Sequence, residues 1–255
     1  MEACALNDFY SPAQRARFLN AVSKRRSVRA YKSEPDVAQL SALQYAAARV
    51  CLPGVRIEIA DMPPELLFRR LPVVGGITGT EKFAAVIADT SVPRAGLLAG
   101  ISGEAFILEA TGLDVGTCWV ASFRRKEILL PLEENEKVLA VTPLGIPNEV
   151  PAGRKRRKLT EICAGDPASW PLWAYNAAEC VRQAPSAVNL QPWRLDYAGR
   201  TLMLFKSSGL SSAATLPLDL GIALLHMSLG AGDTPHTLYW GEGKEIASMV
   251  VEEEA

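Results

Sequence analysis

The predicted order of helices and strands occurs twice along this chain. Residues 35–113 are predicted to contain a helix, a proline, a pair of strands and an apolar helix, and residues 170–231 repeat that order. The apolar segments GEAFILEATGL and LGIALLHMSLG also resemble each other in the spacing of their small and apolar residues. This repeated order has no fixed repeat period, so the pattern alone leaves internal duplication and coincidence equally open.

Hydrophobic periodicity predicts the individual elements. Residues 12–25 and 35–51 carry apolar side chains at helical spacing, whereas VRIEIAD alternates apolar and charged residues as a half-buried strand does. FAAVIAD is a continuous apolar run, which suits a strand buried on both faces. GEAFILEATGL, at residues 103–113, predicts a buried helix because two glutamates are its only charged residues.

The remaining elements are predicted from turn residues and alternation. DVGTCWVASF is expected to be a buried strand, followed by a short polar helix near RRKEILLPLEEN. WRLDY and TLMLFK alternate on either side of AGR, which predicts a hairpin. The acidic tail VVEEEA is expected to fray.

The charge balance argues against two classes of partner. Twenty-seven Lys and Arg residues against 28 Asp and Glu give a net charge of -1, so no overall field attracts DNA or an anionic membrane. The longest apolar stretches are interrupted before they reach the roughly 18 residues of a membrane span. We therefore expect no nucleic-acid partner and no membrane insertion.

Cysteine and histidine usage indicates the compartment. The five cysteines are odd in number, lie far apart and form no CxxC pair, which favours free thiols over a disulfide framework or a zinc site. We therefore expect a cytoplasmic protein. The two histidines offer little material for a metal site or a catalytic triad, and no metal is expected.

Three polar clusters could carry chemistry: RRSVR at 25–29, RKRRK at 154–158 and PSAVNLQPW at 185–193. Guanidinium groups in the first match a phosphate or a planar carbonyl edge, although arginines at a helix end also favour the helix dipole. The second cluster fits a phosphate clamp, a nucleic-acid patch or a solvated loop. The third is either a structural turn or a binding turn whose polar side chains provide donors and acceptors.

Two other patterns carry less weight. Glu104 and Glu109 are separated by five residues, which places them apart around a helix and argues against an acid/base pair. The glycines of VVGGITGTE lack the strand-to-helix GxGxxG context of a dinucleotide-binding loop.

Five stretches together resemble the FMN-dependent nitroreductase family. RRSVRAY resembles its opening R-x-S-x-R/K element, and GEAFILEATGLDVGTCWVASF resembles its central helix and G-x-G-T-x-W strand. PLGIPNE and GRKRRKLTEI resemble the later strand and turn and the basic segment that follows. APSAVNLQPW resembles the A-P-S-x-x-N-x-Q-P-W element. The resemblance extends from about residue 19 to about residue 231 and implies an α+β fold of mixed sheets flanked by helices.

The position of APSAVNLQPW departs from the family pattern. In ordinary members this element follows the first helix after RRSxR, and two subunits together grip FMN; here it lies in the C-terminal half. The order resembles a branch of the family in which a single chain mimics the homodimer. It implies a fused pseudo-dimer, a monomer with an internal pseudo-twofold, divided into residues 1–165 and 166–255, with one complete FMN site.

The resemblance also implies which residues contact the cofactor. The expected contacts are Arg25, Arg26, Ser27 and Arg29; Trp119, Val120 and Ala121 near the flavin N5 and O4; Arg156 and Arg157 at the phosphate; and Pro185, Ser186, Ala187, Asn189 and Gln191. No catalytic side chain is implied, because the hydride is transferred at the flavin N5.

The activity implied by the resemblance is an oxidoreductase that uses NAD(P)H to reduce nitroaromatic, quinone or similar small acceptors by a ping-pong mechanism. One alternative is a family member that binds FMN without reductase turnover. Another is a nucleic-acid-binding or scaffold protein that uses residues 154–158, against which the neutral overall charge counts.

Overall fold

The computed structural model describes residues 2–68, 76–149, 151–153, 155–207 and 213–252. Its contacts divide the chain into two compact units. Unit 1 comprises Met1–Ser23 and Arg154–Ala255, and unit 2 comprises Lys24–Gly153. The N-terminal residues therefore pack with the C-terminal part of the chain, whereas the predicted division at residue 165 follows sequence order alone.

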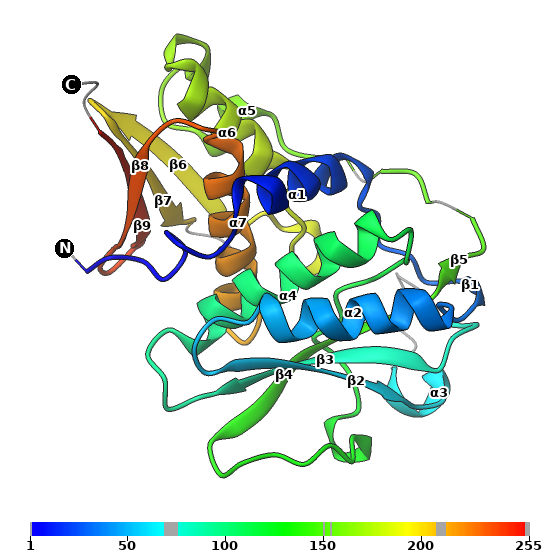
Figure 1. Cartoon of the computed structure of the whole chain (residues 1–255). Helices are drawn as coiled ribbons and strands as arrows, with labels where there is room; N and C mark the ends of the chain where they lie inside the picture. The colour runs from blue at the N-terminus through cyan, green and yellow to red at the C-terminus, as the bar shows by residue number, and fades with distance from the viewer. Residues whose placement is uncertain (1, 69–75, 150, 154, 208–212, 253–255) are drawn as a thin grey trace. The chain divides into compact units, whose positions relative to one another are not determined.

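Unit 2 is a small antiparallel sheet covered by two helices. Its elements are β1 (Tyr31–Ser33), α2 (Val37–Arg49), β2 (Val55–Asp61), α3 (Pro64–Leu67), β3 (Lys82–Asp89), α4 (Ala95–Gly112), η1 (Arg125–Glu127), β4 (Glu136–Pro143) and β5 (Ile146–Pro147). The sheet order is β2-β3-β4, and β1 pairs separately with β5. Figure 1 shows α2 and α4 over one face of this sheet.

Local sequence explains both helices. Asp36 and Gln39 form a capping box that starts α2, and the Gln39 amide also donates to the Leu113 carbonyl at the end of α4 at 2.9 Å. Helix α4 is buried on nearly all sides from Leu98 to Leu108, because it packs against β2, β3 and α2. The apolar run FAAVIAD forms the central strand β3, as its continuous hydrophobicity predicts.

Unit 1 has a second antiparallel sheet. Its elements are α1 (Pro12–Lys24), α5 (Leu159–Ile162), η2 (Pro167–Ser169), α6 (Leu172–Gln183), η3 (Ala187–Asn189), β6 (Trp193–Ala198), β7 (Thr201–Lys206), α7 (Leu216–Gly230), β8 (His236–Trp240) and β9 (Glu245–Val251). The sheet order is β6-β7-β9-β8. Helices α6 and α7 lie side by side in Figure 1, and they approach closely at Gly230, where a Cβ would lie 2.6 Å from Cys180 Cβ.

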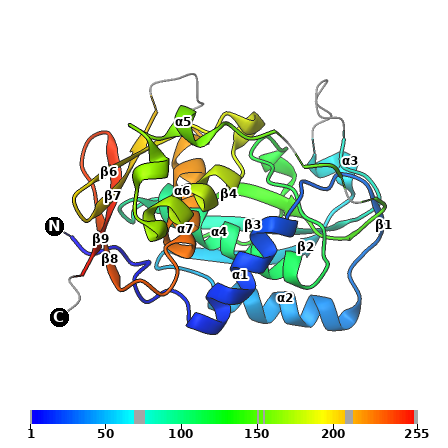
Figure 2. The ribbon, with the colours of Figure 1, turned by 90° about the horizontal axis from the view of Figure 1, so that it is seen from above.

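The N-terminal segment completes the edge of this sheet. Ala3 forms an antiparallel bridge with Tyr239, and the Cys4 N–H donates to the Leu238 carbonyl at 2.9 Å. The described N-terminal and C-terminal segments therefore both lie at the β8–β9 side of unit 1 (Figure 2). The hairpin of β8 and β9 was not predicted, and the first residues of the tail expected to fray belong to β9.

The sequence echo corresponds to a repeated order of elements. Unit 2 contains α2-β2-β3-α4-β4 with β3 between β2 and β4, and unit 1 contains α6-β6-β7-α7-β9 with β7 between β6 and β9. In each unit the two helices of this order pack against each other, α2 on α4 and α6 on α7. Unit 1 adds β8 at the edge of its sheet.

Several predicted elements differ from those observed. Helix α4 begins at Ala95, well before the predicted start at residue 103, and the predicted polar helix is reduced to η1. DVGTCWVASF forms only isolated bridges at Gly116, Thr117, Val120 and Phe123 and is not a named strand. The α+β class is confirmed. In the described residues the ladders between named strands are antiparallel, and parallel pairing occurs only as isolated bridges.

Candidate functional site

The arginine element begins where α1 ends. Ser27 forms a parallel bridge with Thr117, and the Val28 N–H donates to the Thr117 carbonyl at 2.8 Å. The Tyr31 hydroxyl donates to the Val28 carbonyl at 2.8 Å. These bonds hold residues 27–31 against the segment that follows α4, so the arginine side chains project from a fixed backbone.

Arg25 lies beside a buried carboxylate. Its Nε is 3.8 Å from Glu104 Oε1, and Glu104 Oε2 accepts the Trp119 indole N–H at 2.7 Å. Burial lowers the pKa of Arg25, and the negative charge of Glu104 partly offsets this effect. The terminal nitrogens of Arg25 donate to no described residue. Arg25 is thus anchored on one side while its terminal nitrogens remain available to a ligand.

The neighbouring polar groups differ in their contacts. Arg26 Nη1 donates to the Arg25 carbonyl at 2.9 Å, and Arg29 Nη1 lies 3.5 Å from the Ser27 carbonyl, at the limit of a hydrogen bond. The Ser27 hydroxyl has no partner among the described residues. The element therefore presents cationic and hydroxyl donors, a set suited to an anion or a carbonyl edge.

The segment Trp119–Ala121 was expected to offer backbone groups to a ligand. The Trp119 ring packs against Gly103, where a Cβ would lie 2.4 Å from Trp119 Cη2. Val120 exchanges both of its backbone hydrogen bonds with Val141 at 2.9 Å, so it has no spare backbone donor. The N–H groups of Trp119 and Ala121 are the ones that remain without a backbone acceptor in the described residues.

The turn at residues 185–191, in unit 1, has an unusual backbone. Val188, Asn189 and Gln191 have φ angles of 44°, 62° and 50°, in the left-handed region that side chains other than glycine rarely adopt. Such conformations persist only when surrounding contacts impose them, and they are concentrated at functional sites. Pro185 is buried and precedes the turn, and Ser186 Oγ accepts the Gln191 N–H at 2.8 Å across it.

The basic segment holds this turn in place. Arg156 donates through Nη1 to Asn189 Oδ1 and through Nη2 to the Gln183 carbonyl at 3.1 Å. Asn189 Nδ2 donates to the Lys155 carbonyl at 3.0 Å, and Gln191 Oε1 accepts the Arg157 N–H at 2.9 Å. The structure thus brings the second and third sequence clusters together, and it uses Arg156 to fix the turn.

Arg157 differs from Arg156. Its side chain is exposed, and its guanidinium has no partner among the described residues. Of the two arginines expected at a phosphate, Arg157 is therefore the one whose charge is available. Arg154, the first residue of the basic run, lies outside the described residues.

Asp219, from the first turn of α7, supports the turn from a third direction. Its Oδ1 accepts the Ala187 N–H at 2.9 Å, while its Oδ2 is buried and has no hydrogen-bond partner among the described residues. Burial raises the pKa of Asp219 to about 7, although the bond from Ala187 acts in the opposite direction. Sequence reasoning missed this residue, although it is the only carboxylate in a largely apolar helix.

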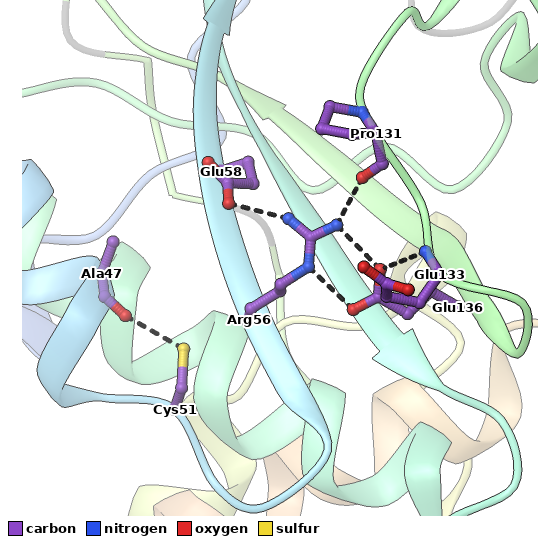
Figure 3. Close-up of polar contacts among 7 residues, drawn as sticks. All are labelled: Ala47, Cys51, Arg56, Glu58, Pro131, Glu133 and Glu136. Carbon is purple, nitrogen blue, oxygen red and sulfur yellow. Dashed lines mark hydrogen bonds and ion pairs between the residues drawn. The ribbon is translucent and has the colours of Figure 1, made fainter.

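A depression of about 440 Å³ in unit 2 is not a good candidate for an anionic ligand. It is lined by Asp89, Glu133, Glu134 and Glu136 with Arg56, whose guanidinium binds both oxygens of Glu136 at 2.8 Å (Figure 3). Arg56 also donates to Glu58 at 2.7 Å and holds the pKa of Glu136 down to about 2. Since Arg56 is already paired, the remaining carboxylates would repel a phosphate.

Comparison with solved structures identifies the fold. A Thermotoga maritima MSB8 protein described as a "putative nitroreductase" matches with a TM-score of 0.67 and 21% identity, over 92% of this chain and 93% of that one. At this identity the match establishes the shared fold alone. The chain therefore has a nitroreductase-type fold, as predicted.

Two other solved structures match more weakly. A protein from Parabacteroides distasonis ATCC 8503, described as a "putative NADH dehydrogenase/NAD(P)H nitroreductase", has a TM-score of 0.48 and 20% identity over 57% of this chain and 96% of that chain. A nitroreductase with bound FMN from Bacteroides fragilis NCTC 9343 has a TM-score of 0.42 and 18% identity, over 55% of this chain and 94% of that chain. These scores are too low to carry an argument. No curated protein sequence matches the chain.

A family model identifies the family. The model described as "Putative TM nitroreductase" matches residues 17–231, which is most of the chain, and the chain belongs to this family. The match includes the arginine element, the segment after α4, the basic segment and the turn. Among the described residues, no helix has the length and hydrophobicity needed to cross a membrane.

Proposed function

We propose that this chain is an FMN-dependent oxidoreductase that uses NAD(P)H to reduce small acceptors such as nitroaromatics or quinones by a ping-pong mechanism. The observation that carries the proposal is the family match over residues 17–231, which includes both predicted cofactor-binding elements. We also propose a cytoplasmic location, on the five widely separated cysteines, and that the chain, as a fused pseudo-dimer, works as a monomer.

The donor groups of the described residues fit FMN. Arg25, Ser27 and Arg29 offer donors to the pyrimidine edge, where cations favour the negatively charged reduced ring. The exposed guanidinium of Arg157 is suited to the phosphate. For the rest of the molecule, the turn at 185–191 offers the Ser186 hydroxyl and the second N–H of the Asn189 side-chain amide, whose other groups bind Arg156 and the Lys155 carbonyl. FMN, when bound, supplies the hydride-accepting N5, and the chain's own residues bind and orient it.

Arg157 provides a test of how the cofactor is held. Replacing Arg157 with Gln removes an available charge without touching the Gln191 contact, which uses the Arg157 backbone. We expect FMN affinity to fall about tenfold or more, as for a lost charge-assisted hydrogen bond, with riboflavin affinity unchanged because riboflavin lacks the phosphate. Titration of both flavins by fluorescence quenching measures this difference.

The matched control is Arg194→Gln, which removes another exposed arginine of unit 1. It should leave both affinities unchanged. An equal loss of FMN and riboflavin in Arg157→Gln would show that Arg157 supports the turn instead of the phosphate. A wild-type protein that binds neither flavin would overturn the proposed function.

Turnover separates the reductase from a family member that only binds FMN. The FMN-loaded protein should oxidise NADH or NADPH in the presence of a quinone. Stopped-flow mixing with each nicotinamide alone should bleach the flavin, because in a ping-pong reaction the cofactor is reduced before the acceptor binds. Bound FMN that neither nicotinamide bleaches would favour the binding-only alternative.

A further inference from the structure

Asp219 is buried beside the turn of residues 185–191, and the proposed function assigns it no role. It is 4% exposed, and Oδ1 accepts the Ala187 N–H inside the turn of residues 185–191. Its Oδ2 has no hydrogen-bond partner among the described residues. Buried polar atoms without partners are rare in folded proteins, and each one calls for an explanation such as an absent ligand or water.

The geometry places this oxygen at the turn. Both carboxylate oxygens are bonded to one carbon, so an Oδ1 that lies 2.9 Å from the Ala187 nitrogen keeps Oδ2 beside the same turn. The strained backbone from Val188 to Gln191 is therefore fixed on one side by Arg156 and on another by a carboxyl group that has an unused oxygen. The unused oxygen is a hydrogen-bonding position next to the candidate ligand-binding turn.

We propose that Asp219 Oδ2 binds a hydroxyl group of the small molecule held by this turn. On the proposed function, which this inference extends, that group is a hydroxyl of the ribityl chain of FMN. A carboxyl group excludes the phosphate from this position because like charges repel. The ribityl chain is the uncharged part of FMN that carries hydroxyl groups.

The titration of Asp219 favours a hydroxyl over the ring N–H. Burial raises the pKa of this carboxyl group to about 7, so protonated and ionised forms are both present near neutral pH. A hydroxyl can donate to the carboxylate and accept from the carboxylic acid, whereas an N–H group can only donate. A hydroxyl is therefore matched to both forms.

The variant Asp219→Asn isolates Oδ2. The side-chain oxygen of the asparagine can still accept the Ala187 N–H. Its NH₂ group takes the position of Oδ2, so a group that can only donate replaces a carboxyl oxygen. Because the substitution removes a buried ionisable group, the unliganded protein should unfold at an equal or higher temperature than the wild type. Weaker ligand binding in an equally stable protein is a result that a purely structural role does not produce.

The test is a cycle of two proteins and two ligands. Full-length wild type and Asp219→Asn are titrated with riboflavin and with lumiflavin, which has the same ring and ring N–H but a methyl group in place of the ribityl chain. At a pH well above the Asp219 pKa of about 7, the wild type offers a charge-assisted bond to the hydroxyl, whereas the variant offers only a neutral amide-to-hydroxyl bond. At that pH we expect riboflavin affinity to fall about tenfold in the variant and lumiflavin affinity to remain unchanged. The variant Asp219→Ala, which also loses the Ala187 contact, should weaken both ligands.

Three results would overturn the inference. Unchanged riboflavin affinity in Asp219→Asn would show that Oδ2 contacts no ligand. An equal loss for riboflavin and lumiflavin would assign the contact to the ring or to the shape of the turn. If Asp219→Asn does not fold, the wild-type protein is titrated with riboflavin analogues that lack single ribityl hydroxyls, and equal affinities for all of them would exclude the contact. Failure of the wild type to bind any flavin would overturn the proposed function as well.

Discussion

Val188 adopts a backbone conformation that its side chain disfavours. Its φ of 44° lies in the left-handed region, its side chain is β-branched, and the residue is 72% exposed, so side-chain packing does not account for the conformation. The hydrogen bonds of the flanking residues to Asp219, Arg156 and Arg157 impose it. The strain is the cost of presenting the polar groups of this turn in one arrangement.

Replacing Val188 with Gly should therefore stabilise the protein. Glycine relieves the left-handed strain, which costs about 1–2 kcal/mol. Its greater backbone entropy in the unfolded chain costs roughly 0.5–1 kcal/mol, so a small gain in the free energy of unfolding remains. Chemical denaturation of the unliganded protein measures the change. The control Val37→Gly, at another exposed valine that begins α2, should destabilise by up to about 1 kcal/mol. A loss of stability in Val188→Gly would contradict the strain assigned to this residue.

At the residue level, the sequence resemblance named the candidate ligand-binding residues but not the different contacts that each of them makes. Arg25, Arg29 and Asn189 were named from motif resemblance, and all three lie in the elements predicted. That Arg156 fixes the turn while Arg157 remains available depends on side-chain geometry that no spacing encodes. Glu104 was considered only as a partner for Glu109, whereas its contacts include Arg25 and Trp119.

Among the elements, α4 shows how a helix positions the candidate site. Gly103 allows the Trp119 ring to lie against the helix, and Glu104, the next residue, binds the Trp119 indole and lies beside Arg25. Two consecutive positions of one helix thus fix a segment and an arginine that resemble cofactor-binding elements of the family. Both positions lie in the stretch that the sequence predicted as a buried helix.

The variant Gly103→Ala tests this packing. The added Cβ would lie 2.4 Å from Trp119 Cη2 and 3.1 Å from Val86 Cγ2, so Trp119 must move while Glu104 holds its indole. We expect a loss of about 1–3 kcal/mol in the free energy of unfolding. The matched control is Gly112→Ala at the end of α4, where a Cβ would meet no atom within 4 Å. It should be neutral or stabilising, and equal effects of the two variants would contradict the packing role.

Most elements could be predicted from periodicity, and the exceptions have physical reasons. The hairpin of β6 and β7 was predicted because its strands alternate on either side of a tight turn. The segment after α4 was predicted as a strand, but it forms only isolated bridges, because an apolar run does not specify a partner. The hairpin of β8 and β9 was missed, although the turn GEGK between HTLYW and EIASMVV is a hairpin signal.

For the whole molecule, the repeated element order gives the sequence echo a structural basis. Each unit has a helix, two antiparallel strands, a second helix packed on the first and a further strand beside the second strand. The arginine element lies in one unit and the strained turn in the other. Sequence order alone could not show that the N-terminal segment joins the C-terminal unit, because the pairing of Ala3 with Tyr239 spans nearly the whole chain.

The central proposal is that residues of both elements bind one and the same FMN. The direct measurement is a titration of the full-length chain with FMN, repeated with Arg29→Ala and with Asn189→Gly. Arg29 is preferred to Arg25 because removing Arg25 would leave Glu104 as a buried charge without its neighbouring cation. Glycine at position 189 keeps the left-handed backbone and removes the side chain together with its bonds to Arg156 and the Lys155 carbonyl, so the stability of this variant is measured alongside its FMN affinity.

We expect the wild type to bind one FMN per chain, and we expect each variant to weaken binding about tenfold or more without changing the stoichiometry. Arg194→Gln should bind FMN as the wild type does. A wild-type chain that binds no FMN, or an affinity that responds to only one of the two substitutions, would contradict the claim.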